Sequence, residues 1–140
     1  MTKGVVAVDS SAIIAIMLEE KEKSDFLRVL GHSRRNFCST VTFLECVMVL
    51  STRAPRISLP RFTNGLADFA IEQVSVDADH ALLAGQAFLR FGKGRHPAKL
   101  NMGDCFSYAL AKSLNAPLLY KGDDFGQTDI VSALTMETRP

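Results

Sequence analysis

The sequence predicts an α/β protein with a mostly parallel central sheet covered by helices on both faces. Short apolar runs rich in β-branched residues alternate with longer segments of helical composition, which is typical of strand–helix–strand crossovers. The first run, residues 4–8 (GVVAV), is apolar throughout, as expected for a strand buried on both faces. A chain of 140 residues can build one hydrophobic core. We therefore expect a single domain over residues 1–140.

The N-terminal half is predicted to contain three strands and four helices. Asp9, Ser10 and Ser11 offer helix-capping side chains directly after the first strand, and Pro55 is expected to end the third helix. The predicted helices cover residues 12–20, 23–30, 40–53 and 59–71, and the predicted strands cover residues 4–8, 37–39 and 73–76.

The C-terminal half is predicted to contain two longer helices and one short strand. An alanine-rich helix over residues 79–91 has a candidate Asp cap, and the loop 92–100 (GKGRHPAKL) carries glycines, a proline and cationic side chains. A helix over 102–114 and a strand over 117–120 follow. The polar turn 121–129 (KGDDFGQTD) then precedes residues 130–134.

Composition and charge exclude several classes of protein. The chain is 47% hydrophobic and 22% charged, which is ordinary for a folded domain, and its net charge of +1 lacks the strong basic excess of many nucleic-acid-binding domains. The 3 cysteines have no C-x-x-C spacing, so we expect buried thiols. No apolar run reaches the roughly 18 residues of a membrane span, and Asp9 interrupts the N-terminal one, so we expect a cytoplasmic protein.

Two acidic residues lie in strongly apolar surroundings. Asp9 follows the first strand and should face the crevice at the edge of the sheet, although it could also serve as a helix cap. Glu45 is the only charged residue within 37–52, and burying an unpaired carboxylate is costly. Its structural alternative is a capping box with Thr42, which a helix beginning at Thr40 or earlier would exclude.

Further acids lie where a helix begins and where a late strand ends. Asp104 falls in the first turn of a predicted helix, where the helix dipole alone would favour it. Asp123, Asp124 and Asp129 lie in a polar turn, where aspartate is common. The combination with the two earlier acids is more informative, because carboxylates that converge repel one another unless a cation joins them. Hard oxygen ligands favour Mg²⁺ or Mn²⁺ over zinc.

Two other kinds of site receive less support. The three histidines, His32, His80 and His96, show no metal-ligand spacing and no serine or cysteine partner for a catalytic triad. A receiver-like phosphoacceptor domain would need paired acids after the first strand, where only Asp9 is found. Its acceptor aspartate would follow a middle strand, where Asp77 lies without such partners.

Four segments resemble the PIN-domain nucleases, and more closely the VapC toxins of bacterial toxin–antitoxin pairs. They are VVAVDSSAIIAI around Asp9, STVTFLE ending at Glu45, GKGRHPAKLNMGDCFSYALAK around Asp104, and LLYKGDDFGQTDI around Asp124. They span nearly the whole chain in the family's order. The resemblance implies a three-layer α/β/α PIN-like domain.

The resemblance also implies the roles of the acids. Asp9, Glu45 and Asp104 take the family's invariant catalytic and metal-binding positions, and the fourth acid maps best to Asp124. Further candidates for contacting the metal or its ligands are Asp123, Thr128 and Asp129.

The implied activity is a Mg²⁺-dependent endoribonuclease, with Mn²⁺ as a substitute, acting as the toxin of such a pair. The expected partners are an RNA substrate, a VapB-like antitoxin and a second copy of the chain. Candidate RNA-binding residues are Lys93, Arg95, His96, Lys99, Arg34 and Arg35. The alternative within the same fold is a catalytically silent module that only binds a partner.

Overall fold

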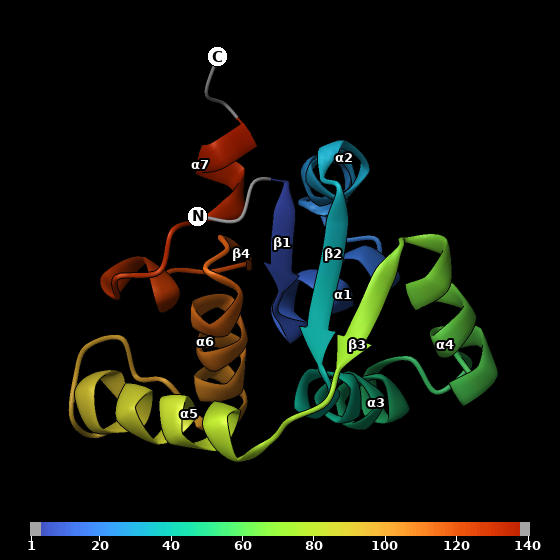
Figure 1. Cartoon of the computed structure of the whole chain (residues 1–140). Coiled ribbons are helices and arrows are strands. Elements are labelled where there is room, and N and C mark those ends of the chain that lie inside the picture. The colour runs from blue at the N-terminus through green and yellow to red at the C-terminus, as the bar shows by residue number, and fades with distance from the viewer. Residues whose placement is uncertain (1–3, 138–140) are drawn as a thin grey trace.

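Four parallel strands form the central sheet of the computed structural model, which describes residues 4–137 (Figure 1). The strands are β1 (Val5–Val8), β2 (Arg35–Ser39), β3 (Ile71–Val74) and β4 (Leu118–Leu119), in the spatial order β3-β2-β1-β4. The chain moves outward from β1 to β3 and then returns to the other side of β1. The strand order therefore reverses between β1 and β4, and ligands of open α/β sheets bind beyond the carboxyl ends at such a point.

Helices cover both faces of this sheet, which confirms the predicted α/β/α layers. They are α1 (Ser10–Met17), α2 (Lys23–His32), α3 (Thr40–Arg53), α4 (Leu59–Asp68), α5 (Ala78–Phe91), α6 (Met102–Leu114), the 3₁₀ turn η1 (Phe125–Gln127) and α7 (Ala133–Glu137). In Figure 1 the arrows of β1 and β2 point toward α3, while α7 lies beyond the opposite end of the sheet. Within the described part of the chain, no helix has the length and apolar character to span a bilayer.

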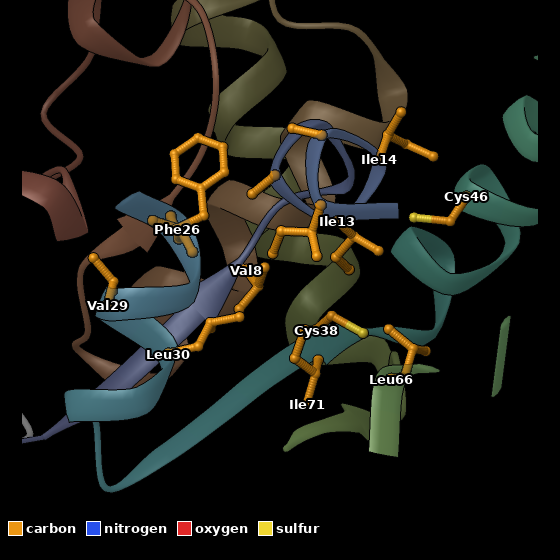
Figure 2. Packing of buried hydrophobic residues seen from close by; sticks show 14 of the residues in the cluster. Val8, Ile13, Ile14, Phe26, Val29, Leu30, Cys38, Cys46, Leu66 and Ile71 are labelled. Atoms are coloured by element: carbon orange, nitrogen blue, oxygen red, sulfur yellow. The ribbon is translucent and has the colours of Figure 1, made fainter. Parts of the chain in front are cut away.

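The sheet separates two hydrophobic cores because the side chains of a strand alternate between its faces. Val6 and Val8 of β1 pack into the core built with α1 to α4, whereas Ala7 packs into the core built with α5 and α6. Figure 2 shows the first core, in which Val8 and Ile13 lie among side chains from β2 and the surrounding helices. Asp9 directly follows Val8, so its backbone leaves a strand that packs against both cores.

The three cysteines are buried free thiols. Burial raises the pKa of Cys38 to about 12 and that of Cys105 to about 11, and it also raises the pKa of Cys46. A thiol with so high a pKa is a poor nucleophile near neutral pH, because the thiolate is the reactive form. These residues serve as small apolar groups of the two cores.

The element boundaries agree closely with prediction in some places and differ in others. The helices predicted over 40–53 and 102–114 are found with those limits. The helix predicted over 59–71 instead ends at Asp68, and the strand predicted over 73–76 begins at Ile71. Ile71 is buried and pairs with Asn36 of β2, so sheet pairing determines where this strand begins. Asp77 caps α5 by accepting a hydrogen bond from the backbone N–H of His80.

Candidate functional site

Asp9 lies at the carboxyl end of β1 and is almost fully buried, with 2% of its surface exposed. Its Oδ2 accepts hydrogen bonds from the backbone N–H of Ser11 at 3.0 Å and from the Ser11 hydroxyl at 2.7 Å. Its Oδ1 accepts a hydrogen bond from the hydroxyl of Ser107 on α6 at 2.5 Å. Asp9 is thus both the cap of α1 and a buried acid at the carboxyl edge of the sheet.

Glu45 extends from the second turn of α3. This helix begins at Thr40 and is capped by Ser39, whose hydroxyl accepts from the backbone N–H groups of Val41 and Thr42. A capping role for Glu45 is therefore excluded. Its Oε1 is buried and accepts no hydrogen bond from the part of the chain that the structure describes.

The carboxylate of Glu45 packs against the backbone of Gly103, at the start of α6. A Cβ atom built on Gly103 would overlap both oxygens of this carboxylate. The absent side chain at position 103 is thus what allows α3 and α6 to bring Glu45 beside Asp104.

Asp104 lies in the first turn of α6 within a capping box. Its Oδ2 accepts from the backbone N–H of Asn101 at 3.1 Å, while the Asn101 side chain accepts from the backbone N–H of Asp104 at 2.9 Å. The sequence analysis missed the role of Asn101, which the N-x-x-D spacing indicates. The box therefore fixes one oxygen of the Asp104 carboxylate.

Electrostatic effects show that these acids lie near one another. The pKa of Glu45 is raised to about 7, mainly by burial and also by the charges of Asp9 and Asp104, against the opposing effect of a hydrogen bond from Ser10. The pKa of Asp104 is raised to about 6 by burial and by the charges of Asp9 and Asp124, against the hydrogen bond from Asn101. The charges of the neighbouring acids thus make ionisation of Glu45 and Asp104 less favourable.

The turn after β4 brings Asp124 toward these acids. The backbone N–H of Lys121 donates to the hydroxyl of Ser11 at 2.9 Å, so the turn is fastened to the residue that also holds Asp9. Asp123 and Asp124 are both exposed, and the charge of Asp124 contributes to the raised pKa of Asp104. The fourth acid is therefore at the open side of the cluster.

Thr128 and Asp129 make other contacts. The Thr128 hydroxyl donates to the carbonyl of Phe125 at 2.7 Å and closes the 3₁₀ turn. Asp129 accepts from the Tyr108 hydroxyl at 2.7 Å through Oδ1 and from Lys112 at 2.8 Å through Oδ2. Both oxygens of Asp129 are thus engaged by α6, and the structure does not bring this residue into the acid cluster.

The candidate RNA-binding residues fall at two different ends of the sheet. Lys93, Arg95 and Lys99 are exposed in the loop that leads into α6, and His96 is half-buried, its Nδ1 accepting from the backbone of Ala98. This loop lies a few residues before Asp104 in the sequence.

Arg34 and Arg35 lie at the opposite end, which corrects the expectation that they flank the acids. Arg35 pairs in register with Val5, the first residue of β1, whereas Asp9 follows its last residue. Arg35 also forms an ion pair with Glu72 at 2.7 Å. Because β1 and β2 are parallel, the start of β2 cannot lie near the carboxyl edge.

The carboxylate oxygens of these acids suit a hard divalent cation, although they do not surround a single point in this structure. Among residues 4–137, no three acidic, histidine or cysteine side chains are arranged to hold an ion as they stand. The buried Oε1 of Glu45 nevertheless has no donor among the described residues, and carboxylate oxygens are the ligands that Mg²⁺ and Mn²⁺ prefer. The residues present fit such an ion.

Comparisons with known proteins agree with this fold. The family model of the PIN domain matches residues 6–131. Ribonuclease VapC30 of Mycobacterium tuberculosis is 38% identical over 127 residues, which cover 91% of this chain and 97% of that protein.

Two solved structures share the fold at low sequence identity. The crystal structure of M. tuberculosis VapC20, a sarcin–ricin loop cleaving toxin, matches with a TM-score of 0.74 and 16% identity over 96% of this chain and 99% of that one. A toxin–antitoxin complex from Klebsiella pneumoniae matches with a TM-score of 0.67 and 18% identity, covering 91% and 97% of the two chains.

Proposed function

The chain belongs to the PIN-domain family and, within it, to the VapC ribonucleases, and from this membership we propose that it is a metal-dependent endoribonuclease. The observation that carries the proposal is the environment of Glu45. Glu45 is half-buried beside two other acids, and its buried Oε1 has no hydrogen-bond partner among residues 4–137. A purely structural site would not keep an acid in this environment, because burying an unpaired carboxylate is costly.

We propose that Asp9, Glu45, Asp104 and Asp124 hold Mg²⁺, with Mn²⁺ as a substitute. PIN-domain ribonucleases are generally metal-dependent, and the acids here offer only hard oxygen ligands. A bound ion would offset the repulsion that raises the pKa of Glu45 and Asp104. Because the acids do not enclose one position without the ion, binding requires the Glu45 and Asp104 side chains to draw together.

The reaction is the hydrolysis of an RNA phosphodiester, with products that carry a 5′-phosphate and a 3′-hydroxyl. A bound ion would supply an activated water nucleophile and would offset negative charge on the phosphate. Asp9 keeps a fixed position because both its oxygens are hydrogen-bonded, while the capping box holds Asp104 at the start of α6. Lys93, Arg95 and Lys99 bind phosphates on either side of the cleaved bond.

We further propose that the chain is the toxin of a toxin–antitoxin pair. It would act on RNA in the cytoplasm, as a homodimer, and would be restrained by a VapB-like antitoxin. The support comes from its VapC relatives and from the toxin–antitoxin complex that shares its fold. The receiver-like alternative is less well supported, because its candidate acceptor, Asp77, serves as the N-cap of α5.

The direct test measures Mg²⁺-dependent cleavage of a mixed RNA substrate by the wild-type chain, Asp9→Asn and Asp104→Asn. We expect cleavage by the wild type that chelation with EDTA abolishes, and a loss of at least about a hundredfold in each variant, as for ligands of a catalytic ion. Arg35→Gln is a matched control at the far end of the sheet and should retain activity. A folded wild-type chain that cleaves no RNA with Mg²⁺ or Mn²⁺ would favour the silent partner-binding module.

A further inference from the structure

Two buried hydroxyl groups join the helices that carry Glu45 and Asp104. Thr42 lies three residues before Glu45 on α3 and has 0% of its surface exposed. Ser107 lies three residues after Asp104 on α6 and has 1% exposed. Residues three apart share a helix face, so each hydroxyl lies about one turn from an acid and toward the same side.

The hydroxyls form a chain of contacts that ends at Asp9. The Ser107 Oγ lies 2.5 Å from Asp9 Oδ1, and the Thr42 Oγ1 lies 3.4 Å from Ser107 Oγ. An ionised carboxylate only accepts hydrogen bonds, so the single hydrogen of Ser107 goes to Asp9. Thr42 is therefore the donor in the longer contact, and the order is Thr42 to Ser107 to Asp9.

Ser107 holds the Asp9 oxygen that the cap of α1 does not engage. The backbone of Asp9 is held by its own N–H, which donates to the carbonyl of Leu119 at 2.9 Å. Its Oδ2 is held by Ser11. The two oxygens of a carboxylate turn together about the terminal torsion, which is broad for aspartate, so the loss of Ser107 would remove one of the two supports that resist this rotation.

We propose that Ser107 is a positioning residue for Asp9, oriented in turn by Thr42, and that it directs the free lone pairs of Asp9 toward the ion. The inference rests on the proposed metal-dependent function of the same site. Each carboxylate oxygen can accept more than one contact, so Oδ1 can bind Ser107 and still face a cation. The arrangement also couples the spacing of α3 and α6 to the orientation of Asp9.

The test measures the dissociation constant of Mn²⁺ by electron paramagnetic resonance, alongside kcat and KM for Mg²⁺-dependent RNA cleavage. Ser107→Ala should weaken Mn²⁺ binding by about 10- to 100-fold, the range typical of groups that orient metal ligands, and should lower kcat more than it raises KM. Ser113→Ala is the matched control, because Ser113 lies on the same helix and its hydroxyl donates only to the carbonyl of Leu110.

Two substitutions at Thr42 separate hydrogen bonding from packing. Thr42→Val keeps the shape and removes the hydroxyl, whereas Thr42→Ser keeps the hydroxyl and removes a methyl group. We expect Thr42→Val to weaken Mn²⁺ binding by up to about tenfold, because its contact is long, and Thr42→Ser to bind Mn²⁺ like the wild type.

The opposite results would overturn the inference. Unchanged Mn²⁺ affinity in a folded Ser107→Ala, while the wild type binds Mn²⁺ and cleaves RNA, would refute the positioning role and leave the proposed function standing. Equal Mn²⁺ affinities in the two Thr42 variants would show that the Thr42 hydroxyl has no part in positioning Asp9. A wild-type chain that binds no Mn²⁺ would instead refute the proposed function itself.

Discussion

The backbone of Gly103 lies directly against the carboxylate of Glu45, so no side chain fits between them. This contact joins the first turn of α6 to the second turn of α3. The atoms that a larger residue would meet are the far end of a flexible side chain, which can move away without disrupting the fold. The position of Glu45 should therefore be unusually sensitive to residue 103.

Gly103→Ala should leave a folded protein whose Glu45 is displaced. We expect Mg²⁺-dependent RNA cleavage to fall by about 10- to 100-fold, as when a metal ligand loses its support. Gly85→Ala is the matched control, because Gly85 lies within α5 with open space around it. That change should raise the melting temperature slightly, since alanine favours helices, and leave cleavage unchanged. Full activity in Gly103→Ala would contradict the assigned position of Glu45.

The metal-free protein should become more stable as the pH falls from about 7 toward 5. The pKa of Glu45 is about 7 and that of Asp104 about 6, both above their ordinary values, so the folded chain binds more protons than the unfolded chain in this range. The free energy of unfolding therefore rises as these groups become protonated. Urea denaturation at several pH values, with EDTA, measures the effect.

Glu45→Gln isolates the contribution of Glu45 to this pH dependence. Relative to the wild type, this variant should be more stable at pH 7.5 than at pH 5, because glutamine carries no charge at either pH. The quantity compared is the difference in unfolding free energy between the two proteins. A difference that does not vary with pH would show that the pKa of Glu45 is not raised. Saturating Mg²⁺ should stabilise the wild type more at pH 7.5 than at pH 5, since the ion competes with protons.

Asp129→Asn should destabilise the fold without weakening metal binding. Asp129 connects the segment after η1 to Tyr108 and Lys112 on α6, and these contacts lower its pKa despite the opposing effect of burial. The loss of a partly exposed ion pair and hydrogen bond should lower the melting temperature by a few degrees. Mn²⁺ titration of the same variant should give the wild-type affinity. A large loss of affinity would restore Asp129 as a candidate ligand.

Substitution of Lys93 should weaken RNA binding, whereas substitution of Arg34 should not. In a background of Asp104→Asn, which prevents cleavage, Lys93→Gln should weaken binding to single-stranded RNA. The slope of log K for RNA binding against log salt concentration should also become less steep by about 0.7, the value for one lost phosphate contact. Arg34→Gln should leave both quantities unchanged, because Arg34 adjoins the amino end of β2. Equal effects would place RNA across both ends of the sheet.

The sequence was most informative where burial and charge conflict. Glu45 stands alone as a charge within an apolar helix, and Asp9 follows a strand that is apolar on both faces, so both could be predicted as site residues. The limits of α3 and α6 were also predicted, from the helical composition of both segments and, for α3, from Pro55 beyond its end.

Features that depend on how elements pack could not be predicted in the same way. The contact between Ser107 and Asp9 requires α6 to cross β1 with one particular rotation, and the spacing from Asp104 shows only which face Ser107 occupies. The separation of Arg34 and Arg35 from the acids follows from the register of β2 on β1, which sequence patterns do not determine. Likewise, pairing with β2 places the start of β3 at Ile71.

Asp9, Glu45 and Asp104 should bind one divalent ion together. The most direct measurement is an anomalous difference map from crystals of the wild-type chain grown with Mn²⁺. We predict a Mn²⁺ peak in contact with carboxylate oxygens of all three residues, with Oε1 of Glu45 among them. A well-ordered site without such a peak at saturating Mn²⁺, or a peak bound elsewhere, would contradict the account.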